Sequence, residues 1–254
     1  MFAGDTGSAS RWRRSVAPVA DPVGRVRNDP AQYDELTDQW WQPAGGFAVL
    51  HWLAASRAEH VPPPPAPGAV LVDLACGGGL MAPHVARLGY RHVGVDLGLA
   101  GLRLARTHGV AVVRGSVLDV PLADGCADVV VAGEILEHVA DDGRVLAECA
   151  RLLRPGGTLV VDAIAATRLA GLVAVRIGER VPGGPPPGIH DPALFVDRAA
   201  LVATAARVGL DLHLVGLRPS LPDLLAWRRG RRETVRMRPM RYTGVLFAGY
   251  GRKR

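Results

Sequence analysis

Residues 70–79 read VLVDLACGGG and are followed by an Ala/Leu/Arg-rich stretch at about 80–88. The apolar run predicts a buried strand over Val70 to Leu74, and Gly77, Gly78 and Gly79 predict a turn that opens a helix. Glycine is needed in such a turn where a ligand approaches the backbone closely or where φ is positive. This stretch therefore predicts a strand, a ligand-binding glycine turn and a helix.

The same alternation continues along the chain. Strands are expected at 70–74, 92–95, 111–114, 129–132 and 158–162, with helices at 80–88, 99–107, 134–139 and 142–153. Beyond them, helices are expected at 168–178 and 197–208 and strands at 210–217 and 242–250. Strands that alternate with helices predict an α/β fold in which a doubly wound parallel sheet carries helices on both faces.

The sequence predicts three parts, which are a leader, a helical lid and a main domain, with a spacer before the main domain. Residues 1–28 show no periodicity and are expected to be a loose leader. Residues 29–60 predict a helical lid with helices at about 30–41 and 47–59, the first with Asn28 or Asp29 as its N-cap. The run VPPPPAPG at 61–68 is expected to be a stiff spacer, and 69–254 the main domain.

Composition excludes several classes of protein. Of the 254 residues, 48% are hydrophobic and 21% are charged, which favours a globular core over disorder. No apolar run is long enough to span a membrane, and no secretory signal is visible, so a cytoplasmic location is expected. The three cysteines, Cys76, Cys126 and Cys149, lack the spacing of a disulfide framework or a thiolate zinc site.

The net charge of +6 is concentrated at one end. Residues 228–254 hold ten basic side chains and one acid, Glu233, while the other residues sum to −3. This basic segment is compatible with an anionic lipid surface, RNA or an acidic ligand, and equally with a solvated surface.

A second acid narrows the choice of ligand. Asp96 ends the next strand, 19 residues after Gly77, where a carboxylate can accept hydrogen bonds from both ribose hydroxyls of a nucleoside. A dinucleotide usually requires a third glycine, and Ala82 stands at that position. The pattern from Asp73 to Gly79 resembles instead the D-x-x-C-G-x-G of class I methyltransferases, which bind S-adenosylmethionine. In that resemblance Ser116 and Val117 fall at the tip of the turn that recognises adenine.

The segment GEILEHV at 133–139 carries the reactive side chains. On a helix, Glu134, Glu137 and His138 would share one face and could bind a divalent ion such as Mg²⁺. A metal would lower the pKa of a catechol hydroxyl and align its oxygen. Alternatively, His138 lines the substrate pocket or acts as the base without a metal.

Longer stretches extend the resemblance. DELTDQWWQPAGGFAVLHWLAASR (34–57), GEILEHVADD (133–142), LLRPGGTLVV (152–161) and VPGGPPPGIHDPALFV (181–196) resemble the ubiquinone-biosynthesis O-methyltransferases. These enzymes methylate polyprenylated catechols. The resemblance covers about residues 30–217, and its most specific part is Trp40-Trp41 followed by Gly46-Phe47 and His51.

The resemblance implies a fold and a set of site residues. The fold is a seven-stranded, Rossmann-like methyltransferase sheet with an N-terminal helical lid, and the methyl donor is S-adenosylmethionine. Glu134, Glu137 and His138 match the positions assigned to a divalent metal in eukaryotic members, and His138 is also the candidate base. His190 is a reserve candidate for this role. The residues expected to bind the cofactor are Arg57, Asp73, Ala75, Gly77, Gly79, Asp96, Ser116, Val117 and Gly133.

The family also implies membrane contact. Its insertion after the fifth strand is associated with lipid, and the counterpart here, about 165–191, pairs apolar residues with Arg168, Arg176 and Arg180. A helix at the inner face of the membrane and a lid helix packed on the core both fit this pattern.

The chain departs from the family at Ala165-Ala166-Thr167 and in the basic LAWRRGRRETVRMRPM at 225–240, where specificity would be set. We therefore expect O-methylation of a small, catechol-like aromatic, polyprenylated in the family. Methylation of another phenol, amine or carboxylate remains open, and an RNA-associated protein using residues 228–254 is the less favoured alternative.

Overall fold

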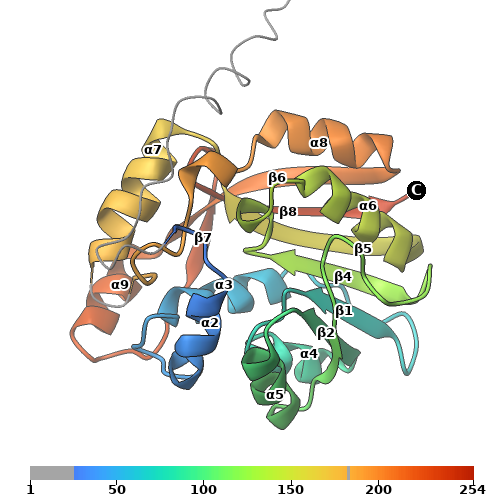
Figure 1. Ribbon diagram of the computed structural model, residues 1–254, viewed down its shortest axis with the longest axis horizontal. Helices are drawn as coiled ribbons and strands as arrows, with labels where there is room; N and C mark the ends of the chain where they lie inside the picture. The colour runs from blue at the N-terminus through green and yellow to red at the C-terminus, as the bar shows by residue number, and fades with distance from the viewer. Residues whose placement is uncertain (1–25, 182–183) are drawn as a thin grey trace, which may run out of the picture.

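The computed structural model describes residues 26–181 and 184–254, so the expected leader lies almost wholly outside the described residues. Eight strands form one mixed sheet in the order β3-β2-β1-β4-β5-β8-β6-β7 (Figure 1). The strands are β1 (Val70–Leu74), β2 (Arg91–Asp96), β3 (Ala111–Arg114), β4 (Ala127–Gly133), β5 (Leu153–Ile164), β6 (Leu210–Pro219), β7 (Met237–Met240) and β8 (Leu246–Lys253).

The first five strands are parallel, as the alternation of strands and helices predicted, and the last three are not. β8 pairs antiparallel with both β5 and β6, and β7 extends the edge by pairing antiparallel with β6. The α/β fold is as expected, but the sheet has eight strands rather than seven. β7 is a short strand with Pro239 at the sheet edge, where a residue without a backbone N–H is tolerated.

Alternation along each central strand divides the core into two layers. Val72 and Leu74 of β1 pack in one apolar cluster with α6 (Asp142–Leu152) and α8 (Arg198–Arg207). Leu71 of the same strand packs on the other face with α3 (Ala48–Ala58) and α4 (Ala82–Leu88). Because successive side chains of a strand point to opposite faces, a run that is apolar throughout is buried on both sides.

Local capping explains where the helices begin and end. Asp141 accepts a hydrogen bond from the Arg144 N–H at the start of α6, and Asp197 accepts two at the start of α8. Gly89 ends α4 with a φ of 89°, a conformation that glycine adopts at little cost. The remaining helix of this half is α5 (Leu99–Thr107), which packs beside β2 and β3.

The basic segment at 228–254 belongs to the sheet. Part of it forms β7 and β8, and α9 (Leu221–Arg228) precedes it. Lys253 donates to the Leu153 carbonyl at 2.8 Å, and Arg236 pairs with the carboxylate of Asp223. The strand expected at 242–250 corresponds to β8, which lies in the interior of the sheet, whereas β7 was not expected.

The N-terminal helices are shorter than expected. The helix predicted at 30–41 is broken into α2 (Ala31–Glu35) and a 3₁₀ turn η1 (Thr37–Gln39). Asp29 accepts from the Ala31 N–H at 3.0 Å, whereas Asn28 does not cap the helix. The Trp41 indole donates to the Gly78 carbonyl at 2.9 Å, so this region lies on the glycine turn.

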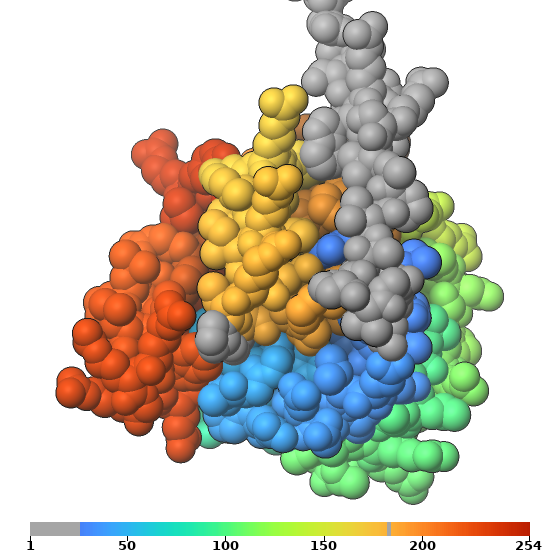
Figure 2. Space-filling view, turned by 60° about the vertical axis from the view of Figure 1, so that its left-hand side comes forward, coloured from blue at the N-terminus to red at the C-terminus, as the bar shows by residue number. Residues whose placement is uncertain are grey.

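The insertion at 165–191 lies between the N-terminal helices and the C-terminal segment (Figure 2). The helix expected at 168–178 consists of α7 (Arg168–Ala170), a π-helical turn η3 (Gly171–Ile177) and a 3₁₀ turn η4 (Gly178–Arg180). A further 3₁₀ turn, η5 (Pro192–Leu194), leads to α8. Within the described residues, no helix is long and apolar enough to cross a membrane.

Candidate active site

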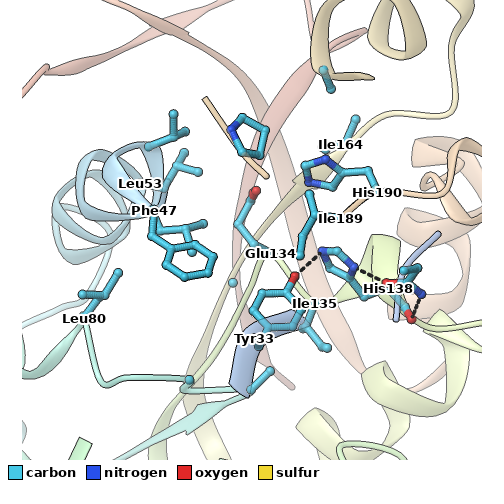
Figure 3. Close-up of a pocket in the computed structure, with 18 of the residues that line it drawn as sticks. Tyr33, Phe47, Leu53, Leu80, Glu134, Ile135, His138, Ile164, Ile189 and His190 are labelled. Carbon is cyan, nitrogen blue, oxygen red and sulfur yellow. Dashed lines mark hydrogen bonds between the residues drawn. The ribbon is translucent and has the colours of Figure 1, made fainter. Parts of the chain in front are cut away.

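A cavity of about 850 Å³ opens at the carboxyl ends of the parallel strands. Its walls come from the glycine turn, the segment after β4, the N-terminal helices and the insertion, and they are mainly apolar (Figure 3). In open α/β sheets ligands bind at this edge, where strand order reverses between β1 and β4.

The glycine turn is shaped for close approach. Ala75 and Gly77 have φ values of 56° and 48°, so the backbone is bent into the left-handed region on both sides of Cys76. A Cβ on Gly78 would meet the Trp40 side chain at 2.8 Å, so the indole and the turn are in contact. Ala75 and Gly77 line the cavity.

Gly79 is an exception among the predicted cofactor residues. It does not line the cavity. Its φ is 79°, and a Cβ there would come within 2.9 Å of Ala105 on α5. The structural reason for this glycine is therefore a turn conformation and close helix packing rather than contact with a ligand.

Asp96 is fixed at the end of β2 by two backbone donors. Its carboxylate accepts from the Gly77 N–H and the Gly98 N–H, each at 2.8 Å. Burial raises its pKa, and these hydrogen bonds oppose that shift. The carboxylate reaches the cavity, as do Asp73, Ser116 and Val117. The Ser116 hydroxyl accepts from the Leu118 N–H at 3.1 Å and holds its turn.

Arg57 reaches the cavity through a buried ion pair. Its Nε donates to Asp162 Oδ2 at 2.5 Å, and the other oxygen of Asp162 accepts from the Glu134 N–H at 2.9 Å. Gly133 has no side chain where the guanidinium packs, since a Cβ there would collide with it. Arg57 and Gly133 both line the cavity. Asp162, a carboxylate that was not predicted, joins Arg57 to the Glu134 N–H.

The expected metal site does not form. Residues 134–139 are not an α-helix, because Glu134 has a φ of 51° and only Leu136–His138 makes a 3₁₀ turn, η2. Glu137 points away from the cavity and accepts from the Ile164 N–H at 3.1 Å. Among the described residues no three His, Cys, Asp or Glu side chains are placed to hold a metal ion.

Glu134 and Glu137 are nonetheless unusual acids. Burial raises the pKa of each, and neighbouring carboxylates raise that of Glu134 further. Glu134 Oε1 is buried, has no hydrogen-bond partner and belongs to a side chain that lines the cavity. An unpaired carboxyl oxygen in a buried site is costly unless a ligand supplies a partner.

His138 is held by a residue that the sequence had placed in the leader. Asn28 Nδ2 donates to the His138 carbonyl at 2.9 Å, which turns the amide oxygen towards Nδ1 of the imidazole at 2.5 Å. Nδ1 therefore carries the proton, and Nε2 is left with a lone pair. The Tyr33 hydroxyl lies 3.3 Å from Nε2 (Figure 3).

The charge states of this pair follow from burial. Burial, with a smaller effect of His190, lowers the pKa of His138 to about 3. Burial and the nearby Glu137 and Glu134 raise the pKa of Tyr33 well above its ordinary value. At neutral pH His138 is therefore a neutral imidazole and Tyr33 a neutral phenol, whose hydroxyl can donate a hydrogen bond to Nε2.

The insertion adds a second imidazole. His190 lines the cavity beside His138, with 5.5 Å between ring centroids. Its Nδ1 lies 3.7 Å from Glu179 Oε1, and Glu179 pairs with Arg27. Sequence reasoning had His190 only as a reserve candidate and missed Tyr33, Asn28, Asp162 and Glu179. Asp162 lies near the end of β5 and Glu179 lies in the insertion, and neither belongs to a recognisable motif.

Comparison with known proteins identifies the fold and the family. Residues 72–161 match the model of the family described as "Methyltransferase domain". A ubiquinone biosynthesis O-methyltransferase of a Caulobacter species is 34% identical over 206 residues, covering 73% of this chain and 81% of that protein. One from Ralstonia nicotianae is 36% identical over 194 residues, covering 72% and 82%.

The chain belongs to the ubiquinone biosynthesis O-methyltransferase family. It is an S-adenosylmethionine-dependent methyltransferase. A solved structure of a possible histamine N-methyltransferase from Thermotoga maritima superposes with a TM-score of 0.64 over 87% of this chain and 98% of that one. At 21% identity this likeness concerns the fold alone, so the α/β methyltransferase fold is confirmed and the substrate is a separate question.

The cavity suits the methyl donor of this methyltransferase. S-adenosylmethionine carries a sulfonium, an ammonium and a carboxylate. The carboxyl groups of Asp73, Glu134 and Asp162 face a single guanidinium, Arg57, around the same end of the cavity. The unpartnered oxygen of Glu134 and the surplus of acids both favour a ligand with excess positive charge.

Proposed function

We propose that this methyltransferase methylates a hydroxyl of a catechol-like aromatic that carries an apolar tail, as in ubiquinone biosynthesis. The observation that carries the proposal is His138, a neutral imidazole whose Nε2 lone pair lies within a mainly apolar cavity next to the glycine turn. Sequence identity of 34–36% to ubiquinone biosynthesis O-methyltransferases supports the same substrate class.

The residues divide the cavity between donor and acceptor. In this proposal Asp96 binds the ribose, the turn at Ser116 and Val117 the adenine, and Arg57 with Glu134 the amino-acid end; all of them line the cavity. When bound, S-adenosylmethionine supplies a methyl group on a positively charged sulfur. His138, Tyr33 and the apolar walls are left for the acceptor.

His138 performs the proton transfer. Its Nε2 takes the proton from the substrate hydroxyl, whose oxygen uses a lone pair to form the new bond to the methyl carbon. The carbon–sulfur bond breaks and its electron pair stays on sulfur. Because the negative oxygen and the positive sulfur neutralise each other, His138 and the apolar walls assist chiefly by positioning and by excluding water.

The tail of the substrate has an apolar path out of the site. Ile164, Val173 and Leu246 line the cavity on the side of the insertion, together with Leu217 of β6. On the outside of the insertion, Leu172 and Ile177 are 46% and 50% exposed and do not line the cavity. We infer that this face lies against a membrane when the enzyme takes a polyprenylated substrate.

Turnover of a short-chain prenyl catechol by the purified protein tests the proposal. We expect methylated product with S-adenosylmethionine, and the same rate in the presence of EDTA, because the acids after β4 do not converge. Binding of S-adenosylmethionine without turnover of any phenol would contradict it and move the acceptor to another nucleophile. Methylation of a phenol of a different class would retain the chemistry and change the substrate.

A further inference from the structure

The proposed proton transfer uses one imidazole, but the cavity contains two. His138 follows β4 and His190 comes from the insertion before α8, and their rings lie on the same wall of the cavity (Figure 3). The ring planes differ by 28° and the centroids are 5.5 Å apart. Both rings line the cavity, so a single aromatic ligand can reach both.

A buried set of charged groups holds His190. Arg27 pairs with Glu179 and donates through Nε to the His190 carbonyl at 2.5 Å. The second oxygen of Glu179 accepts from the Gly188 N–H at 3.0 Å. Burial raises the pKa of Glu179, but the neighbouring His190 and the hydrogen bonds from Gly188 and Arg27 outweigh it, so the pKa lies below its ordinary value and Glu179 is a carboxylate.

This arrangement orients the imidazole. Glu179 Oε1 lies 3.7 Å from Nδ1, too far for a hydrogen bond, and Nδ1 is buried without a partner, so Nε2 is the nitrogen left for the cavity. Glu179 and His190 are each 7% exposed. Burying an arginine, a glutamate and a histidine costs free energy that a ring serving only to fill space would not require.

We propose that His190, held by Glu179 and Arg27, binds the second hydroxyl of a vicinal diol while His138 takes the proton from the hydroxyl that is methylated. This inference rests on the proposed function and makes it more specific. The two imidazoles, rather than a metal ion, distinguish a catechol from a phenol with one hydroxyl. The second hydroxyl forms and breaks no covalent bond, and its role is to fix the orientation of the ring.

The physical basis of the selectivity is an unpaired polar group. A phenol without the second hydroxyl would leave the His190 Nε2 in an apolar cavity with no partner. Sites built to hydrogen-bond a substrate hydroxyl reject the analogue that lacks it far more strongly than apolar pockets reject a change in size. Selectivity between the two substrates therefore reports on His190.

The experiment compares a short-chain prenyl catechol with the same molecule lacking the second hydroxyl, in EDTA. For the wild type we expect kcat/KM to favour the catechol by about 100-fold. In His190→Gln and, more weakly, Glu179→Gln, catechol turnover should fall by about tenfold or more while monophenol turnover changes little. His138→Gln should reduce turnover of both substrates by the same factor. The control is His213→Gln, an exposed histidine of β6 outside the cavity, which should leave both rates unchanged.

The outcomes separate this inference from the proposed function. If wild-type enzyme methylates neither substrate, the proposed function fails and the inference fails with it. If the wild type methylates the catechol but His190→Gln keeps the same selectivity, only the inference is overturned. Binding of S-adenosylhomocysteine shows whether each variant is folded. If His190→Gln is not folded, Glu179→Gln tests the role of His190 in its place.

Discussion

Asn28 sets the tautomer of His138, because its amide oxygen lies 2.5 Å from Nδ1 while its amide nitrogen donates to the His138 carbonyl. In Asn28→Asp a carboxylate would stand beside Nδ1 and favour the imidazolium, which raises the pKa of His138 from about 3. A protonated His138 cannot accept the substrate proton. We therefore expect the acid limb of the kcat/KM profile to move upward by about 1 to 3 pH units.

The pH–rate profile of wild type and Asn28→Asp checks this, with Asn28→Ala as the companion. Asn28→Ala should lower kcat by about tenfold or more without the same shift, since it removes the orienting group and adds no charge. Superimposable profiles for wild type and Asn28→Asp would mean that another group is the base.

Asp96 should carry much of the affinity for the cofactor's ribose, since both of its oxygens are positioned by backbone N–H groups of the turn. Replacing the charged acceptor in Asp96→Asn should weaken binding of S-adenosylhomocysteine by about tenfold to a hundredfold. Titration calorimetry measures it, with Asp119→Asn, an exposed acid outside the cavity, as the matched control. Equal affinities of wild type and Asp96→Asn for S-adenosylhomocysteine would show that Asp96 does not bind the ribose.

Glu137 should make stability fall as pH rises. Burial raises its pKa from 4.5 to about 8, so between these values the folded state holds a proton that the unfolded state has released. The contribution to stability is complete below pH 4.5 and lost as pH passes through about 8. Glu137→Gln remains neutral and can still accept from the Ile164 N–H, so it should raise Tm at pH 8.5 by about 2 to 6 °C and change it little at pH 4.5.

Thermal unfolding at the two pH values measures the effect, and Glu148 provides a control of opposite sign. Glu148 is buried but paired with Arg151, and that hydrogen bond lowers its pKa. Glu148→Gln should therefore destabilise the fold at neutral pH. A Glu137→Gln variant no more stable than wild type at pH 8.5 would show that burial does not raise the pKa of Glu137.

Site residues that are fixed by local backbone structure were predictable from the sequence. Site residues that are fixed by contacts between distant segments were not. Gly77 and Asp96 follow from strand ends and glycine spacing, and both line the cavity. Asn28 lies 110 residues before His138 in the sequence, and no local pattern indicates that its side chain would contact an imidazole. Glu137 matched a family position, but its direction depends on the φ of Glu134, which no motif encodes.

Among the elements, the segment after β4 shows why spacing alone misleads. The i, i+3, i+4 pattern of two acids and a histidine suggests one helix face, yet the chain leaves β4 through a left-handed residue and makes a single 3₁₀ turn. The hydrogen bond from the Glu134 N–H to the Asp162 carboxylate fixes that turn. The sequence pattern therefore predicted a helix at 134–139, whereas a hydrogen bond to a distant strand determines the backbone conformation there.

The insertion turn η3 presents an apolar face that should bind anionic vesicles. Leu172 and Ile177 are 46% and 50% exposed and do not line the cavity, while Arg168 and Arg176 stand on the same segment. In Leu172→Glu/Ile177→Glu, two charges would have to enter the lipid interface. We expect co-sedimentation with phosphatidylglycerol vesicles to fall at least fivefold, while turnover of a water-soluble catechol is retained.

The matched control is Leu99→Glu on α5, where a leucine of 43% exposure lies outside the insertion. Its binding to vesicles should equal that of the wild type. Equal losses in both variants would show that the vesicles detect net charge rather than a lipid-facing surface. If the wild type does not bind vesicles, the insertion is a lid helix that packs on the core and does not contact the membrane.

For the whole molecule, the sequence predicted the parallel strands and the approximate positions of β6 and β8, but not β7 or the antiparallel pairing of the last three strands. The parallel strands are buried on both faces and leave long apolar runs, such as Val129 to Ala132, bounded by turns. β8 contains Gly249, Gly251, Arg252 and Lys253, and β7 contains a proline and an arginine, so neither has the composition of a buried strand. Their places are determined by pairing with β5 and β6, which only the assembled sheet provides.

That topology predicts that the C-terminal segment cannot be removed. A chain ending at residue 241 would lose β8 and expose the facing edges of β5 and β6 together with the core around Phe247. We expect it to be insoluble or to lack cooperative unfolding, as measured by circular dichroism. The control neutralises charge and keeps the strand, by Arg228→Gln, Arg229→Gln, Arg231→Gln and Arg232→Gln, and should keep the wild-type Tm within about 3 °C and bind S-adenosylhomocysteine normally. A truncated chain that unfolds cooperatively and binds S-adenosylhomocysteine would show that β8 is dispensable and that the basic segment is a tail.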